Sequence, residues 1–164
     1  MLWVLLLANW LIPLILSWLY VLFAWIPGWI HFYGYVGGLT WAFDLQDETI
    51  DNWYTRAWAG WAGFGAMSVI LLRDRPSQDE RYGTTIAHEK RHSMQIWTLG
   101  LLQPILYITC SIFLFITAKM GMTPHIHPYL DNPFELDARH AAGQKVDIPP
   151  DEWPRGPKDH WPWW

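Results

Sequence analysis

Long apolar runs separated by short charged segments are the main pattern of the chain. Residues 1–43 contain no Asp, Glu, Lys or Arg. Within them, residues 1–26 are almost wholly apolar and long enough to cross the roughly 30 Å hydrocarbon layer of a bilayer as a helix. Pro27 and Gly28 mark a turn, and residues 29–43 are rich in Gly and aromatic side chains. We therefore predict a hydrophobic helical hairpin over residues 1–43 that anchors the chain in a membrane.

The apolar start of the chain is also compatible with three alternatives to a membrane hairpin. Residues 29–43 suit a re-entrant or interfacial segment as well as a tilted return helix. A cleaved signal peptide is disfavoured, because the start lacks a basic region and no small-residue cleavage site follows the apolar run. A very hydrophobic core helix within a larger assembly is the remaining alternative to a membrane anchor.

The middle of the chain, residues 44–143, predicts a mainly α domain with a small edge strand or sheet, an α+β arrangement. Residues 66–72 end in a Ser-Val-Ile-Leu-Leu run of strand composition, and residues 73–81 read as a charged loop. The window from Thr84 to Leu99 has neither Pro nor Gly, so a helix is expected there. A strand, a polar loop and a helix thus follow one another.

A second apolar run and a short capped helix complete this domain. Residues 101–118 carry no charge and reach the lower limit of length for a membrane span, although a buried core helix is a competing account. Asn132 suits an N-cap, Pro133 a first helical turn and Gly143 a helix stop. The final part, residues 144–164, is Pro-rich with four Trp, which predicts an extended tail lying on a partner, a bilayer or its own domain.

Composition supports the membrane interpretation and argues against nucleic-acid-binding proteins and against metal sites built from cysteines. Hydrophobic residues make up 52% of the 164 residues, and 14 are Trp, which suits a membrane protein. The net charge is -4 and no basic run is present, so we expect no nucleic-acid partner. Cys110 is the single cysteine, and any metal site must therefore use His and carboxylate ligands.

A His-Glu-x-x-His motif lies within the predicted helix of residues 84–99. Residues four apart share a helix face, so His88 and His92 can bind one metal ion. Glu89 lies about 100° further round the helix, beside the metal, where its carboxylate can take a proton from water. This is the pattern of zinc-dependent peptidases, with Zn²⁺ as the expected cofactor, although metal-free helices also carry such histidine pairs. Lys90 and Arg91 are expected to face solvent.

A catalytic zinc ion needs a third protein ligand. The downstream candidates are His or carboxylate residues, namely Glu135, Asp137, His125, His127 and His140. Their spacing alone does not choose among them.

Residues 88–95, HEKRHSMQ, and residues 132–138, NPFELDA, form a pair of segments in a fixed order. Together they resemble the zincin superfamily of metallopeptidases, specifically its gluzincin-like branch, and are similar to small membrane-associated or phage-encoded peptidases. The resemblance covers residues 82–143. It implies a zincin-like metal-binding helical core, with Glu135 as the third ligand and an edge strand beside the substrate groove. Arg139 stands where better-known gluzincins have an Asp that orients a ligand imidazole, which leaves that orienting partner open.

The mechanism that the pattern implies begins with proton transfer to Glu89 from zinc-bound water, whose pKa the metal lowers towards about 7. The hydroxide then attacks a peptide carbonyl, and Glu89 returns the proton to the leaving amine. The oxyanion needs a further donor. Candidates are the tyrosines and histidines around the motifs, namely Tyr82, Tyr107, Tyr129, His125, His127 and His140.

The sequence supports two main functional interpretations. The first is a membrane-anchored zinc hydrolase, most simply a metallopeptidase acting on a peptide or protein. The second is a non-catalytic assembly protein of a virus or membrane complex, which retains the zincin-like core and binds lipid and protein partners through its hairpin and Trp-rich tail. A membrane subunit without metal is a third. Intact Glu89 favours the enzyme, because a structural zinc site has no use for a base. Basic residues cluster over residues 73–91, which favours a cytoplasmic location for the catalytic part.

Overall fold

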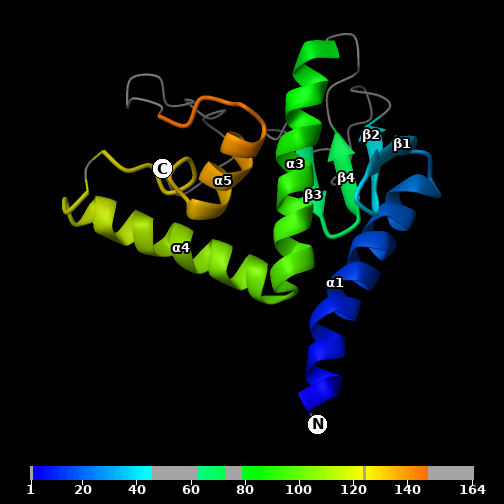
Figure 1. The fold of residues 1–164 in the computed structure, drawn as a ribbon, viewed down its shortest axis with the longest axis horizontal. Helices are drawn as coiled ribbons and strands as arrows, with labels where there is room; N and C mark the ends of the chain where they lie inside the picture. Colours follow the sequence, from blue (N-terminus) through cyan, green and yellow to red (C-terminus); the bar gives the residue numbers. More distant parts are fainter. Residues whose placement is uncertain (1, 46–62, 73–78, 124, 148–164) are drawn as a thin grey trace.

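The computed structural model describes residues 2–45, 63–72, 79–123 and 125–147. Figure 1 shows helix α3 standing between a small sheet on one side and helices α4 and α5 on the other. The prediction of a mainly α, α+β chain is confirmed. In chain order the elements are α1 (Leu2–Trp25), β1 (Ile30–Gly37), β2 (Thr40–Leu45), β3 (Gly63–Ala66), β4 (Val69–Leu72), α3 (Asp79–Leu99), α4 (Leu102–Lys119) and α5 (Pro133–Ala141).

The predicted helical hairpin over residues 1–43 is wrong in its second half. After α1, strands β1 and β2 pair antiparallel as a β-hairpin. The turn between them has three consecutive residues of positive φ, with Gly37 at 87°, Gly38 at 64° and Leu39 at 59°, a conformation that a right-handed helix excludes. Ile30 and Phe43 of this hairpin are buried and pack against α1, whereas Phe32, Tyr33 and Tyr35 of β1 are exposed.

The sheet lies between α1 and α3. Its strand order is β1-β2-β4-β3, with β2 and β4 parallel and the other pairs antiparallel. Val69 and Leu71 of β4 pack with α1, whereas Ile70 and Leu72 on the opposite face pack with Ile86 of α3. The strand predicted within residues 66–72 is therefore confirmed as β4, but it lies inside the sheet. The edge strand that borders α3 is β3.

Helix α3 begins earlier than the motif window predicts. It starts at Asp79 and runs through Gly83, so part of the expected charged loop is helical and residues 73–78 lie outside the described part. Gly100, at a φ of 61°, ends the helix, and α4 follows with Pro104 in its first turn, as expected.

A polar side chain of α1 holds the corner between α3 and α4. Pro13 has no N–H, so it leaves the carbonyl of Asn9 without the usual helical donor. That carbonyl instead accepts from the backbone N–H of Leu101 at 3.1 Å, and the Asn9 Oδ1 accepts from the same N–H at 2.9 Å. The Trp10 indole N–H also donates to the Trp97 carbonyl at 2.9 Å. The start of α1 is thereby fixed to the end of α3.

The predicted cap of α5 is confirmed. The Asn132 Oδ1 accepts from the backbone N–H of Phe134 at 3.0 Å, and Pro133 occupies the first helical position. The Nδ2 group of Asn132 donates to the Tyr107 carbonyl at 2.9 Å and to the Ser111 hydroxyl at 2.7 Å. One fully buried amide therefore both caps α5 and joins it to α4.

Asn132→Ala should lower the free energy of unfolding by about 3 kcal/mol, because it removes a cap and leaves buried polar partners unpaired. Chemical denaturation in detergent micelles would measure this loss. Asn132→Ser, which keeps a capping oxygen, should recover about 1 kcal/mol of it. Equal stability of all three proteins would show that the contacts of Asn132 do not join α5 to α4.

Candidate metal centre

Two histidines of α3 and one glutamate of α5 converge on a single point. The Nε2 atoms of His88 and His92 lie 3.1 Å apart. The His88 Nε2 lies 3.3 Å from the Oε2 of Glu135, and the His92 Nε2 lies 3.3 Å from its Oε1. Ligands at about 2.0–2.1 Å from a tetrahedral zinc ion lie about 3.4 Å from one another. The three side chains are therefore spaced as ligands of one metal ion, and they form the group of possible ligands among the described residues.

The hydrogen bonds of Gln95 fix the protonation of His92. The Gln95 Nε2 donates to the Phe134 carbonyl at 3.0 Å and to the Asp137 Oδ2 at 2.7 Å. Both partners are acceptors, so the amide nitrogen must face them and the Gln95 Oε1 must face the His92 Nδ1, which lies 2.9 Å away. The Nδ1 of His92 therefore carries the hydrogen. In a neutral imidazole the lone pair of the His92 Nε2 then points toward His88 and Glu135.

His88 has a similar partner from further along the chain. Its Nδ1 lies 3.1 Å from the Oε1 of Gln144, just after α5. An amide oxygen accepts the Nδ1 hydrogen, which again leaves Nε2 as the ligand atom. The two ligand imidazoles are thus each oriented by a glutamine.

The carboxylate of Glu135 is buried and only half satisfied. Its Oε1 accepts from the Tyr107 hydroxyl at 2.7 Å, whereas its Oε2 has no hydrogen-bond partner among the described residues. Burial raises the pKa of Glu135, but hydrogen bonds from the His88 and His92 rings in their protonated form outweigh burial and hold this pKa well below its ordinary value. When the two rings are neutral and turn their Nε2 lone pairs to the ionised carboxylate, the group suits a cation, because acceptors alone would repel one another.

Glu89 lies beside this group and is held by the edge strand β3. The backbone N–H of Gly65 donates to its carboxylate. Burial raises the pKa of Glu89 above its ordinary value, against the opposing influence of His92 and His88. Glu89 is 7% exposed, so its carboxylate is buried next to the ligands. This is the location predicted for a base.

The glycines of β3 allow α3 to approach the sheet edge closely. A Cβ built on Gly65 would lie 2.2 Å from the backbone oxygen of Glu89 and 3.1 Å from the Cβ of His92. A Cβ on Gly63 would lie 2.9 Å from the Glu89 Cγ. Two small residues on alternate positions thus place β3 directly against the turn of α3 that carries the motif.

The other predicted ligands are not brought to the group. Asp137 pairs with Arg91 instead, through bonds of 2.7 and 2.8 Å. The His127 Nδ1 accepts the backbone N–H groups of two following residues, and burial lowers its pKa. His125 and His140 are exposed.

The predicted oxyanion donors are also distributed differently. Tyr107 and Tyr129 both interact with Glu135, and burial raises the pKa of Tyr129. Both tyrosines therefore contact the carboxylate of Glu135, one of the three possible metal ligands. The side chain of Tyr82 lies outside the described residues, as does the tail from residue 148 onward.

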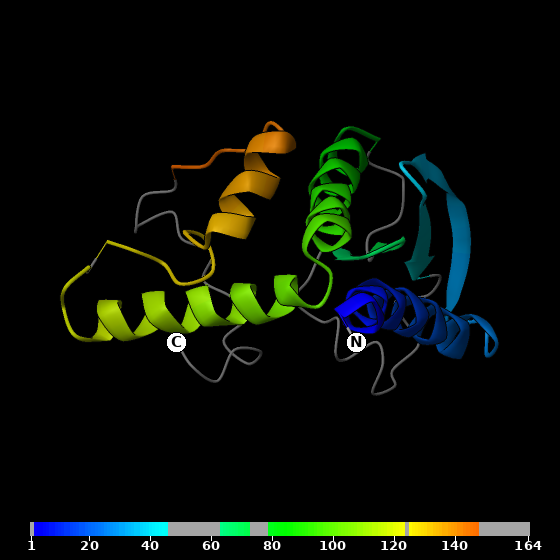
Figure 2. The same cartoon turned by 60° about the horizontal axis from the view of Figure 1, so that its bottom comes forward.

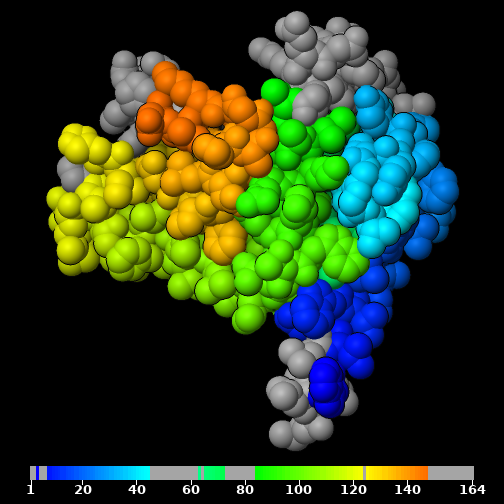
Figure 3. All heavy atoms as spheres, in the orientation of Figure 1, coloured from blue at the N-terminus to red at the C-terminus, as the bar shows by residue number. Residues whose placement is uncertain are grey.

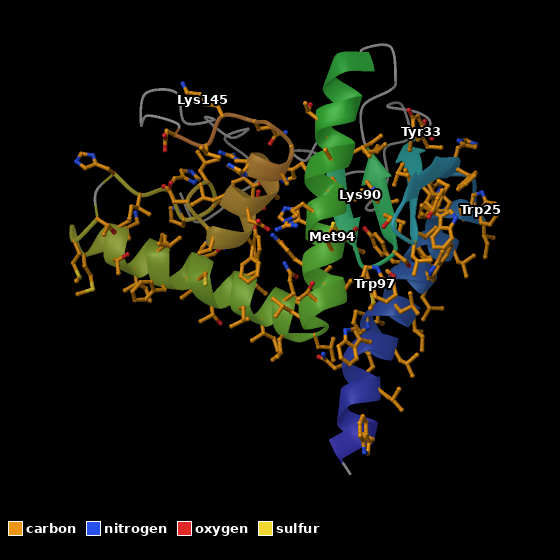
Figure 4. The ribbon with its side chains drawn as sticks, viewed as in Figure 1. Trp25, Tyr33, Lys90, Met94, Trp97 and Lys145 are labelled. Carbon is orange, nitrogen blue, oxygen red and sulfur yellow. The ribbon has the colours of Figure 1, made fainter. Side chains whose placement is uncertain are left out.

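Lys90 and Arg91, the two variable positions of the motif, were expected to face solvent, but both contact other elements of the fold. Lys90 donates to the Val36 carbonyl of β1 at 2.9 Å, and Figure 4 shows it on the side of α3 nearest the strands. Arg91 binds Asp137, and this pairing lowers the pKa of Asp137. The arginine, Asp137, Gln95 and His92 thus form a continuous chain of hydrogen bonds. Sequence reasoning did not assign a role to Gln95, although its position three residues after His92 places it on the same helix face.

Gln95→Leu should weaken zinc binding by about 10–100-fold, because the imidazole of His92 loses the partner that orients it. Competition with a chelator of known affinity would measure the change. Met94→Ala, an exposed neighbour on α3, is the matched control and should bind zinc like the parent. An unchanged affinity in Gln95→Leu would show that the network does not tune the ligand.

Comparison of the chain with protein-family models, curated proteins and solved structures gave no match. The assignment of chemistry to this chain therefore depends on the geometry of its own residues.

Proposed function

We propose that this chain is a membrane-anchored, zinc-dependent hydrolase, most simply a metallopeptidase with a zincin-like core. His88, His92 and Glu135 are the proposed metal ligands, and Glu89 is the proposed base. The observation that carries the proposal is the convergence of two imidazole nitrogens, 3.1 Å apart, on the Glu135 carboxylate, with each nitrogen 3.3 Å from a different carboxylate oxygen and the buried Glu89 beside them. A structural site would need no such base.

The residues around the proposed ligands have separate tasks. Zinc bound by this group would supply Lewis acidity, which polarises a carbonyl and makes water more acidic. Glu89 would accept a proton from water at its carboxylate and return it to the leaving amine. The N–H of Gly65 holds that carboxylate in place. Gln95 and Gln144 orient the two imidazoles, and Tyr107 orients Glu135.

The membrane part of the proposal rests on two apolar helices. Among the described residues, Leu7–Trp25 and Leu102–Lys119 are long and apolar enough to cross a membrane, by length and composition. Both are mostly exposed in the chain itself, so neither serves as a buried core helix of this domain. We propose that they bind lipid and that the catalytic part lies on the cytoplasmic side, in accord with the basic residues 73–91.

Zinc content per chain tests the metal centre. Elemental analysis of the detergent-purified parent should give one zinc per chain, and His88→Ala and Glu135→Ala should lose it, because each removes one of three protein ligands. Glu89→Gln should retain zinc. His140→Ala is the control, since it removes an exposed histidine of α5 outside the ligand group. A parent that binds no zinc even after supplementation would overturn the hydrolase and support the assembly protein.

A further inference from the structure

We propose that α1 and α4 lie side-on in one leaflet of a bilayer, as a single apolar layer beneath the domain, and that neither crosses the membrane. The proposal deepens the membrane part of the proposed function and does not depend on the metal. It assigns a lipid surface to one face of the molecule.

Helix α1 buries one stripe and exposes the opposite one. Ser17, Val21 and Ala24 are buried, the latter two against the sheet. The opposite side carries exposed apolar residues three or four positions apart, namely Ile12, Ile15, Leu19, Leu22 and Ile26. This spacing is one continuous face of a helix. The exposed face therefore lies on the side of α1 opposite the sheet.

Helix α4 has the same arrangement. Tyr107 and Ser111 lie on the side that contacts α5 through Asn132. The opposite side exposes Leu102, Ile105, Ile112, Phe113 and Ile116. Lys119, at the last position of the helix, places its ammonium over the Phe115 ring at 5.6 Å. A lysine there can reach the polar headgroups while its stem stays on apolar surface.

The two exposed faces point to the same side of the molecule. In Figure 2 α1 and α4 lie in one layer, with α3, α5 and the strands on the other side of it. The helices meet where Asn9 binds Leu101 and diverge from there instead of packing along each other. The two helices that form this surface lie within residues 2–26 and 101–118, which carry no charge, and such a surface matches hydrocarbon and not water.

The contacts of each helix oppose a transmembrane orientation. A spanning α4 would carry α5 into the hydrocarbon together with its charged residues Glu135, Asp137 and Arg139, at a high energetic cost. A spanning α1 would carry β1, an edge strand of the described sheet, and expose its unpaired backbone groups to lipid. Side-on burial of one face of each helix avoids both costs.

The first turns of α1 favour lipid over a second copy of the chain as the occupant. Every residue from Leu2 to Ala8 is apolar, and Trp3, Leu7 and Leu11 are exposed. The ribbon in Figure 1 shows the first turns of α1 projecting from the body, and the dark-blue spheres of its described residues lie below the body in Figure 3. A helix that is apolar on all sides needs apolar surroundings on all sides, which a bilayer provides and a flat protein interface does not.

The orientation places the metal centre close to the membrane. Tyr107 extends from the upper side of α4 to Glu135, and one helix is about 10 Å across. The proposed ligands therefore lie above the lipid face by about one helix diameter plus the reach of the Tyr107 side chain. The substrate class that fits is a polypeptide segment next to the membrane surface.

Depth measurement by spin labelling tests the orientation. In a Cys110→Ser background, single cysteines replace Ile12 and Leu19 of α1, Ile26 directly after α1, and Ile105 and Ile112 of α4, all exposed positions. Nitroxide-labelled chains are placed in phosphatidylcholine–phosphatidylglycerol vesicles, with circular dichroism to check the fold. Collisions with lipid-soluble oxygen and with a water-soluble nickel chelate report depth. Thr84→Cys, exposed near the start of α3, is the aqueous control.

We expect the five labels to show one similar depth within a leaflet, and Thr84→Cys to collide with the nickel chelate. Unequal depths along α1, with Ile12 and Leu19 near the middle of the span both deep and Ile26 at its end shallow, would establish a span and overturn the inference. Protection from both reagents, with dimers and no vesicle binding, would establish a second copy as the occupant and also overturn it. Zinc content is measured separately, so a chain without zinc but with equal depths would lose the hydrolase function and keep this orientation.

Discussion

Glu89→Gln should lower the rate of peptide hydrolysis by about 10²–10⁴-fold, the range associated with loss of a general base. The amide keeps the volume of the side chain and retains an oxygen that can accept from the Gly65 N–H, the contact that the carboxylate makes. It cannot accept the proton of water at neutral pH. The substitution therefore separates proton transfer from folding and metal binding.

The measurement combines cleavage of a fluorescence-quenched peptide library with zinc analysis of the same samples. His140→Ala, on the exposed side of α5, should match the parent in both. Full activity in Glu89→Gln would show that Glu89 is not the base. Loss of zinc in Glu89→Gln would instead place Glu89 in the ligand set.

Gly65→Ala should destabilise the domain by about 3 kcal/mol, the upper part of the range for overpacking. The new Cβ would lie 2.2 Å from the backbone oxygen of Glu89, and backbone atoms cannot rotate away as a flexible side chain can. Strand β3 or helix α3 must shift, and the turn that carries His88, Glu89 and His92 would shift with it. We therefore expect weaker zinc binding in addition to lower stability, measured by denaturation in micelles and by chelator competition.

Gly34→Ala provides the matched control. Gly34 is also a glycine of an edge strand, β1, but a Cβ there meets no atom within 4 Å. Its effect on stability should stay within about 0.5 kcal/mol. Equal stability of the Gly65→Ala and Gly34→Ala variants would contradict the close approach of β3 to α3.

The parts of the site that follow local rules could be predicted from the sequence. The spacing of His88 and His92 needs only a helix, and the cap at Asn132 needs only its own following residues. Both are confirmed because capping and helical periodicity act within a few residues of the chain. The choice of Glu135 among the five downstream ligand candidates came only from the resemblance to a family. Local rules could not make this choice, because α5 meets α3 by tertiary packing.

The parts that depend on distant contacts could not be predicted. Residues 30–43 carry no charge and form a β-hairpin that packs in part against α1, and composition alone does not distinguish such a hairpin from a helix in lipid. The role of Gln144, 56 residues from His88, has no signal in the local sequence. The importance of Gly65 likewise depends on which helix lies against its strand. Such features are properties of the assembled fold.

The binding of Asn9 at the corner of α3 and α4 has a consequence for the order of synthesis. Asn9 leaves the ribosome 92 residues before Leu101, its partner. Until then its amide, and the carbonyl that Pro13 leaves unpaired, have no protein partner at that corner, and burying them in hydrocarbon is unfavourable. The nascent α1 would therefore rest at the polar boundary of the bilayer. Synthesis of α4 would then let α1 move to its proposed depth, and because α3 precedes Leu101 in the chain, α3 would already be in place when this happens.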